Sequence, residues 1–120
     1  MVPGTGIRAA IIEDEPFVIE GLTEILTEAG HVVSAVARTR DEALALVEQG
    51  GQFDVVFVDL GLGGKPAGID VARRAVRNEL AVVVMTGGAV LPTDLAGAGL
   101  LLKPFSAEAV RAILHTLLRR

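Results

Sequence analysis

The chain of 120 residues is long enough for one domain with one hydrophobic core and too short for two. Hydrophobic residues make up 51% of it and charged residues 22%, which excludes an intrinsically disordered chain. The absence of cysteine excludes disulfides and thiolate metal sites. The net charge is −4 and lysine occurs only as Lys65 and Lys103, so we expect no direct binding to nucleic acid.

Nothing in the sequence predicts a membrane segment or an export signal. The longest apolar run covers residues 80–85, whereas a membrane helix needs about 18 residues. Residues 1–6 lack the basic start and the apolar stretch of a signal peptide. We therefore expect a cytoplasmic protein without a membrane partner, built as one domain over residues 7–120 behind a flexible tail at residues 1–6.

Short apolar runs alternate along the chain with segments of helical period, beginning with a strand over residues 7–12. Pro16, whose missing N–H costs nothing in a first helical turn, starts a helix that Gly30 ends. The spacing predicts that one apolar stripe of this helix is buried, made of Phe17, Leu22, Ile25 and Leu26.

The middle of the chain predicts a second strand–helix unit and a third strand. Residues 31–37 are predicted as a strand, followed by a helix between the capping residue Thr39 and the glycines at 50–51. The third strand covers residues 54–60. It leads into a loop over residues 61–68, which holds four glycines and one proline.

The last part predicts a third helix over residues 69–78, a fourth strand over 80–86 and a fifth over 100–103. Three arginines near the end of the third helix suit its dipole: Arg73, Arg74 and Arg77. Between the last two strands, glycine and proline leave only a short or frayed helix around residues 93–98. Ser106 caps the final helix, which runs to the two arginines that close the chain.

The third and fourth strands are apolar on both faces, which is typical of a parallel sheet covered by helices on both sides. Crossovers between parallel strands are right-handed in nearly all proteins. The pattern therefore predicts an α/β fold, namely a three-layer α/β/α domain with a doubly wound, five-stranded parallel sheet. We expect the flavodoxin-like strand order 2-1-3-4-5 with a short or degenerate fourth helix.

Ligands of such sheets bind beyond the carboxyl ends of the strands, where the strand order reverses. Glu13 and Asp14 follow the first strand, and Asp59 follows the third. Thr86 and Lys103 follow the fourth and fifth strands. Because the first and third strands are neighbours in the expected order, the three carboxylates should meet in one crevice.

Three carboxylates in one crevice repel one another, by about 3 kcal/mol per pair at about 6 Å and an effective dielectric near 20. A fold keeps such a cluster only if a cation offsets this repulsion or if one acid stays protonated. Oxygen ligands without His or Cys suit Mg²⁺, which usually works together with a phosphate. Lys103 and the hydroxyl of Thr86 could hold phosphate oxygens, and Asp59 could act as a nucleophile that forms an acyl phosphate.

Four segments carry a family resemblance: IIEDEP at 11–16, VVFVDL at 55–60, VMTG at 84–87 and LKPF at 102–105. In their order, spacing and position at strand ends they resemble the response-regulator receiver domains of two-component signalling. The resemblance covers residues 7–119, nearly the whole chain.

The resemblance implies a role for each acidic residue at the strand ends. Asp59 would be the phospho-accepting nucleophile and also a ligand of Mg²⁺. Asp14 would bind Mg²⁺ directly, Glu13 would hold the metal or its water, and the backbone carbonyl of Gly61 would be a further ligand.

The resemblance also implies that Thr86 hydrogen-bonds the phosphoryl group and that Lys103 pairs with it. In relatives the bond between this lysine and the following proline, here Pro104, is cis. Thr86-Gly87-Gly88 resembles a subgroup of stand-alone receivers nicknamed FAT GUY, from whose Phe-Ala the preceding Val84 and Met85 depart.

Further departures from the family pattern concern the output and the lifetime of the phosphate. Leu100 stands where receivers commonly have an aromatic switch residue, which argues against the usual coupling of threonine to an aromatic side chain. Gly63 replaces a common proline, in a loop one residue longer than usual. Gly61 and Gly88 place no side chain beside the site, so we expect fairly unhindered hydrolysis of the phosphate.

The resemblance implies a phospho-accepting receiver domain that is not a turnover enzyme and has no output domain in this chain. A sensor histidine kinase or a histidine phosphotransfer protein would donate the phosphoryl group to Asp59. A conformational change would then act on a downstream protein that the sequence does not identify. We expect a monomer or weak dimer.

Three alternatives predict different residues. A Toprim-type metal enzyme should show Asp-x-Asp after the third strand, where this chain has Asp59-Leu60-Gly61. A receiver degenerated into a binding module would lack Asp59 or Lys103, and both are present. A flavodoxin-like cofactor binder needs a phosphate loop after the first strand, where this chain has three acids.

Overall fold

The computed structural model describes residues 6–49, 52–64, 67–88 and 90–118. Three of the expectations above fall outside these ranges: the flexible tail apart from Gly6, the glycines that end the second helix, and the two arginines that close the chain. None of the helices in the described ranges is long and apolar enough to cross a membrane.

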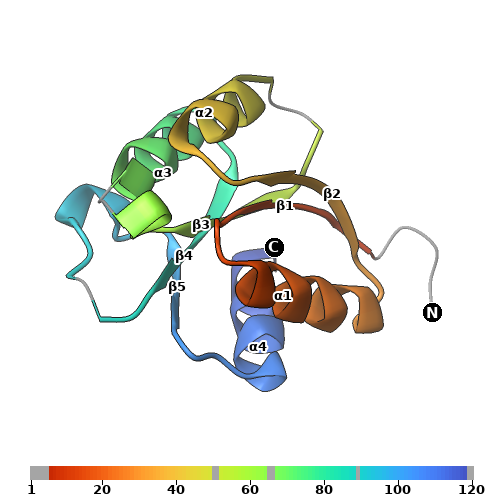
Figure 1. Cartoon of the computed structure of the whole chain (residues 1–120). Coiled ribbons are helices and arrows are strands. Elements are labelled where there is room, and N and C mark those ends of the chain that lie inside the picture. The colour runs from red at the N-terminus through yellow and green to blue at the C-terminus, as the bar shows by residue number, and fades with distance from the viewer. Residues whose placement is uncertain (1–5, 50–51, 65–66, 89, 119–120) are drawn as a thin grey trace.

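Five parallel strands form one sheet in the order β2-β1-β3-β4-β5, which confirms the predicted topology (Figure 1). Each lies within two residues of its predicted position at both ends. The strands are β1 (Arg8–Ile12), β2 (Val32–Ala37), β3 (Val55–Asp59), β4 (Ala81–Thr86) and β5 (Gly99–Leu102).

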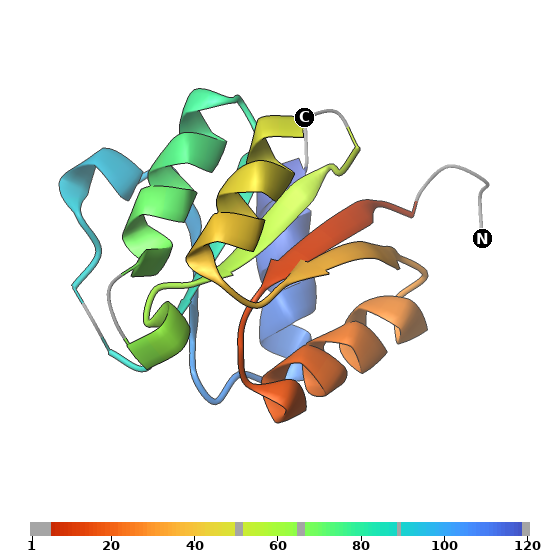
Figure 2. The ribbon, with the colours of Figure 1, turned by 45° about the horizontal axis from the view of Figure 1, so that its top comes forward.

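Helices cover both faces of the sheet, so the three-layer prediction is also confirmed (Figures 1 and 2). One face is covered by α1 (Pro16–Glu28) and α4 (Ala107–Leu118), whose buried leucines pack against Phe57 of β3. The other face is covered by α2 (Arg40–Gln49) and α3 (Ala67–Arg77). Since β1 and β3 are central, side chains on both of their faces are buried, as the run of apolar residues requires.

The predicted helix boundaries have the expected local causes. Thr39 Oγ1 accepts a hydrogen bond from the backbone N–H of Glu42 at 3.2 Å, and Ser106 Oγ accepts one from Ala109 at 3.1 Å. Gly30 follows α1 with a φ of 91°, a left-handed conformation that ends helices and that glycine adopts without strain.

The segment between β4 and β5 contains a single turn of 3₁₀ helix, η2 (Thr93–Leu95), in place of a full helix. This confirms the prediction that the helix expected between the fourth and fifth strands is reduced. Arg73 of α3 donates a hydrogen bond of 2.7 Å to Asp94 and ties the turn to the helix layer. Because η2 is short, Leu100 and Leu102 on β5 are 42% and 59% exposed.

One prediction about the helices is wrong, and one boundary is shifted. Phe17 is 81% exposed, because at 100° per residue it lies on the side of α1 opposite Leu26. The third helix starts at Ala67, two residues earlier than predicted, and one 3₁₀ turn, η1 (Leu62–Gly64), precedes it in the glycine-rich loop. The early start is sterically feasible because Gly68 has no side chain where α3 meets the backbone of Asp59.

Candidate functional site

The structure brings the predicted site residues together at the carboxyl end of the sheet. Glu13 follows β1, Asp59 ends β3 and Thr86 ends β4; these three are only 1%, 7% and 4% exposed. Lys103 follows β5 directly, and Asp14 lies on the exposed side of the loop after β1. Buried polar groups at neighbouring strand ends are what a ligand site of a doubly wound sheet requires.

The three carboxylates form one cluster. Glu13, Asp14 and Asp59 each offer a carboxylate oxygen, and these oxygens lie within 4.8 Å of one another. Two of the acids are buried and the third is exposed, so a bound ion would keep a side open to water.

The carboxylate of Glu13 is held by three hydrogen bonds. Its Oε2 accepts the backbone N–H groups of Asp14 and Glu15 at 3.1 and 3.2 Å. Its Oε1 accepts a hydrogen bond of 2.8 Å from Nζ of Lys103. The buried acid therefore shapes the loop after β1 and orients the neighbouring Asp14.

The side chain of Lys103, which follows the edge strand β5, reaches two acids of the cluster. Its Nζ lies 2.8 Å from Glu13 Oε1 and 3.3 Å from Asp59 Oδ1. Its backbone N–H donates to the carbonyl of Thr86 at 2.8 Å, which fixes the start of the side chain beside β4. The Lys103–Pro104 peptide bond is cis, as the resemblance implied.

The cluster shifts the pKa of two of its members upward. Burial raises the pKa of Glu13 above its ordinary value and the charge of Asp59 adds to this, against hydrogen bonds from Lys103 and a backbone N–H. For Lys103, burial lowers the pKa, but the hydrogen bond to Glu13 and the charges of both acids outweigh it and raise the pKa overall. The ammonium is therefore charged at neutral pH and partly neutralises the acids.

Glycines surround Asp59 where side chains would interfere. Oδ1 of Asp59 accepts the N–H of Gly61 at 3.1 Å, and the carbonyl of Gly61 accepts the N–H of Gly64 at 2.8 Å. A Cβ on Gly68 would lie 2.0 Å from the backbone oxygen of Asp59. The sequence analysis missed this role of Gly68, because a glycine in a helical segment does not by itself reveal which backbone it contacts.

Thr86 lies one residue beyond Met85, which is the register partner of Asp59 in the β3–β4 pair. Its Oγ1 accepts a hydrogen bond of 3.2 Å from the N–H of Gly88. Gly88 has a φ of 138°, a conformation that L side chains rarely adopt. The hydroxyl therefore holds a glycine loop at the rim of the site.

The acidic cluster carries more negative charge than Lys103 alone can neutralise when its three acids are ionised. When all three carboxylates are ionised they face one ammonium, which leaves two negative charges, the amount that one divalent cation neutralises. The donors are all oxygen atoms, which favours a hard ion such as Mg²⁺. The arrangement can thus hold a divalent ion beside the carboxylate of Asp59 and the ammonium of Lys103.

Comparison with known proteins agrees with this geometry. Residues 9–115 match the response regulator receiver domain family. The chain is 35% identical to the transcriptional regulatory protein TcrA of Mycobacterium tuberculosis, over 97% of this chain and 47% of that protein. It thus spans about half the length of this curated relative.

Solved structures show the same fold. The response regulator PhyR from Brucella abortus superposes with a TM-score of 0.80 at 31% identity, over 95% of this chain and 48% of that one. SdrG from Sphingomonas melonis Fr1 superposes with a TM-score of 0.81 at 29% identity, over 94% of this chain and 97% of that one. The chain therefore belongs to the family of response regulator receiver domains, which are signalling modules.

Proposed function

We propose that the chain accepts a phosphoryl group from a phosphohistidine partner on Asp59 and passes the signal on by a conformational change. The observation that carries this proposal is the meeting of Glu13, Asp14, Asp59 and Lys103 at one end of the sheet. A nucleophilic acid, a divalent-ion site and a positive charge are the parts that phosphoryl transfer needs.

The residues present fit a Mg²⁺ ion. Glu13, Asp14 and Asp59 would hold it through carboxylate oxygens, with the carbonyl of Gly61 as a further ligand. That carbonyl already accepts one hydrogen bond from Gly64, and its second lone pair is available to a metal. When bound, the ion neutralises charge on the phosphoryl oxygens, which is the chemistry it supplies.

Asp59 has one oxygen suited to attack. Among the contacts of the described residues, its Oδ1 takes both the N–H of Gly61 and the ammonium of Lys103, which leaves Oδ2 for the nucleophilic step. The new bond joins Oδ2 to phosphorus, and the bond from phosphorus to the histidine nitrogen of the donor breaks. Lys103 can then turn from the carboxylates to the phosphoryl oxygens.

Thr86 would connect the phosphate to the surface. A hydroxyl that turns toward the phosphoryl group gives up its hydrogen bond with Gly88 and releases the loop that follows β4. In this proposal, the loop would adopt two arrangements whose balance phosphorylation shifts. Leu100, where many receivers have an aromatic residue, is partly exposed on the adjacent strand.

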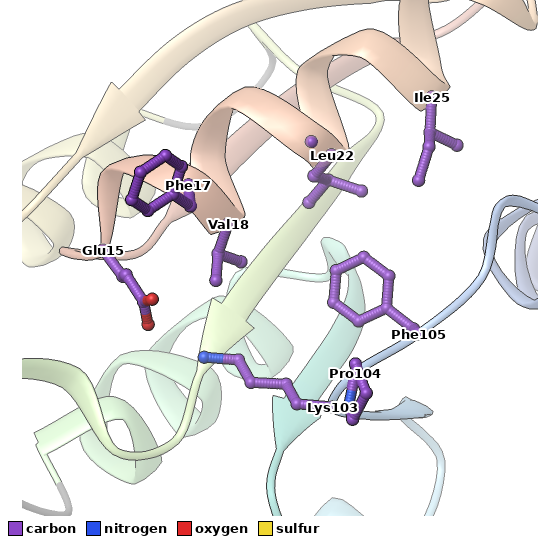
Figure 3. A pocket seen from close by; sticks show the side chains of 9 residues that line it. Glu15, Phe17, Val18, Leu22, Ile25, Lys103, Pro104 and Phe105 are labelled. Atoms are coloured by element: carbon purple, nitrogen blue, oxygen red, sulfur yellow. The ribbon is translucent and has the colours of Figure 1, made fainter.

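The phosphohistidine partner would dock in the groove between α1 and the loop after β5 (Figure 3). This cavity of about 410 Å³ includes Phe17 and Phe105 and extends to Lys103, which is also part of the acidic site. A partner that inserts an apolar side chain here brings its histidine close to Asp59. An exposed Phe17 is unfavourable in water in the free protein, and such a contact would bury it.

Mass spectrometry after incubation with acetyl phosphate and Mg²⁺ tests the proposal. We expect a mass gain of one phosphoryl group in the wild type and in Asp41→Asn, whose side chain is fully accessible on α2 and serves as the control. Asp59→Asn should show no gain. An equal gain in Asp59→Asn would place the acceptor elsewhere, and no gain in the wild type would contradict the proposed chemistry.

A further inference from the structure

A second cavity lies at the opposite end of the sheet, where the strands begin. Its volume is about 510 Å³, within the range of about 300–1,000 Å³ that small-molecule sites occupy. Ile7, just before β1, lines one side, Ala29 and His31 of the turn between α1 and β2 line another, and α4 closes the third. It shares no lining residue with the groove of Figure 3.

Helix α4 contributes four residues that share one of its faces. They are spaced by three, one and three positions: Arg111, Leu114, His115 and Leu118. The two leucines, together with Ile7, form an apolar floor, and Leu114 is buried in the core. Arg111 and His115 are exposed at the rim. The cavity thus combines a hydrophobic floor with nitrogen-bearing groups along one edge.

The imidazole ring of His31 adds a possible hydrogen-bond donor, and its contact with Ile7 fixes which ring nitrogen that is. Its Nδ1 accepts a hydrogen bond of 3.1 Å from the backbone N–H of Ile7, so this nitrogen carries no proton. In the neutral ring the proton is then on Nε2, which can donate to a ligand oxygen.

The lining of this cavity includes the basic side chain of Arg111. None of its lining residues is acidic, although acidic residues outnumber basic ones in the chain by 15 to 11. Within the part of the chain that the structure describes, Arg111 and His115 have no ion-pair or hydrogen-bond partner for their side chains. Donors of this kind beside an apolar floor match an anion that carries an apolar body.

Two other cavities of the described residues lack this combination. The groove beside β5 is lined only by uncharged residues, and the cavity beneath η2 contains Asp94, whose charge Arg73 already neutralises. We propose that the cavity at the amino end of the sheet binds a small organic acid. Its carboxylate or phosphate head would contact Arg111 and His115, and its apolar body would cover Leu114 and Leu118.

NMR titration of the full chain tests this proposal with defined probes. We expect 4-phenylbutyrate to shift the signals of His31 and Leu114 saturably at millimolar concentration, without shifting those of Asp59. The neutral 4-phenylbutan-1-ol and inorganic phosphate, which each lack one half of the pattern, should bind at least tenfold more weakly. Phenyl phosphate in place of the carboxylate shows which anionic head the cavity prefers. Equal binding of the alcohol, or no saturable binding of either acid, would overturn the proposal.

A matched pair of variants locates the anion. The double variant Arg111→Gln/His115→Gln should lose at least tenfold in affinity for 4-phenylbutyrate, because both rim groups are replaced by neutral amides of similar length. Arg77→Gln removes an exposed arginine from α3 and should bind like the wild type. Both variants should still gain a phosphoryl group from acetyl phosphate, which reports an intact fold. Unchanged affinity in the double variant would show that the site does not recognise an anion.

Discussion

The ammonium of Lys103 joins acids that are 46 positions apart in the sequence. Glu13 follows β1 and Asp59 ends the neighbouring central strand β3, and Lys103 approaches both from the edge strand β5. Because the contact is shared, movement of Lys103 toward a phosphoryl group would free both acids to face a metal ion. A single side chain can thus couple ion binding to the state of Asp59.

Because Gly61 has no side chain, we expect water to reach Asp59 easily. A Cβ at this position would lie 3.8 Å from Asp59 Oδ1, a normal van der Waals distance, so a side chain fits and would shield the acyl phosphate. We expect Gly61→Asn to lengthen the half-life of phosphorylated Asp59 up to about tenfold, or about 1.4 kcal/mol in the barrier. Mass spectrometry that follows the loss of the phosphoryl group over time measures this half-life.

Gly63→Asn is the control for this substitution. Gly63 belongs to the same loop, has open space around its Cβ position and a φ of 67°, which asparagine tolerates better than other residues. Its phosphate should decay at the wild-type rate. Equal decay of the Gly61 variant and this control would mean that water does not enter past position 61.

At the scale of elements, α3 determines where the end of β3 lies. Because a Cβ on Gly68 would lie 2.0 Å from the backbone oxygen of Asp59, the helix and the strand have to separate in Gly68→Ala. We expect this variant to lose about 1–3 kcal/mol of unfolding free energy, as in overpacked cores, and to accept phosphate more slowly. Urea denaturation and the acetyl phosphate assay measure the two effects.

Gly21→Ala makes the same chemical change where there is room. The position is in the middle of α1, exposed, with no atom within 4 Å of a built Cβ. Helix propensity alone should stabilise this variant by up to about 1 kcal/mol. Opposite signs for the two substitutions are expected. Destabilisation by both would show that the effect at Gly68 does not come from its close contact.

The single turn η2 is held to α3 by the ion pair between Arg73 and Asp94. Arg73 lowers the pKa of Asp94 below its ordinary value of 3.8, mainly through their hydrogen bond. The pair therefore contributes stability above the ordinary pKa, and this contribution disappears as pH falls through the lower pKa of the folded state. We expect Asp94→Asn to have a lower Tm than the wild type at neutral pH and an equal Tm in acid. In the background of Arg73→Gln the same substitution should have a much smaller effect, because only Arg77 and a backbone hydrogen bond then still favour the charged form of Asp94. An undiminished difference there would contradict the pairing.

On the scale of the whole molecule, the acidic site ties together segments from most of the chain. An ion that binds only the folded state stabilises it by about 2.7 kcal/mol at a concentration of 100 times its Kd. We therefore expect millimolar Mg²⁺ to raise the Tm of the wild type and to raise that of Asp14→Asn less. Na⁺ at equal ionic strength controls for screening. Equal shifts with both salts, or in both proteins, would argue against the proposed ion site.

Much of this architecture could be predicted from local patterns. The apolar runs that became β3 and β4, the caps Thr39 and Ser106, and the loss of a helix before β5 all depend on neighbours in sequence. The error at Phe17 is local as well. The residue is apolar like a core residue, but the helical period places it on the side of α1 opposite the buried Leu26.

The sequence by itself determined the order of strands and helices and which residues stand at strand ends, because hydrophobic period and caps are local properties. Only the tertiary structure decided that Lys103 contacts Glu13 as well as Asp59, and that Gly68 contacts the backbone of Asp59. It alone placed His31 in a cavity with Arg111 and His115. These distances depend on how helices pack on a twisted sheet, which joins residues that no sequence period relates.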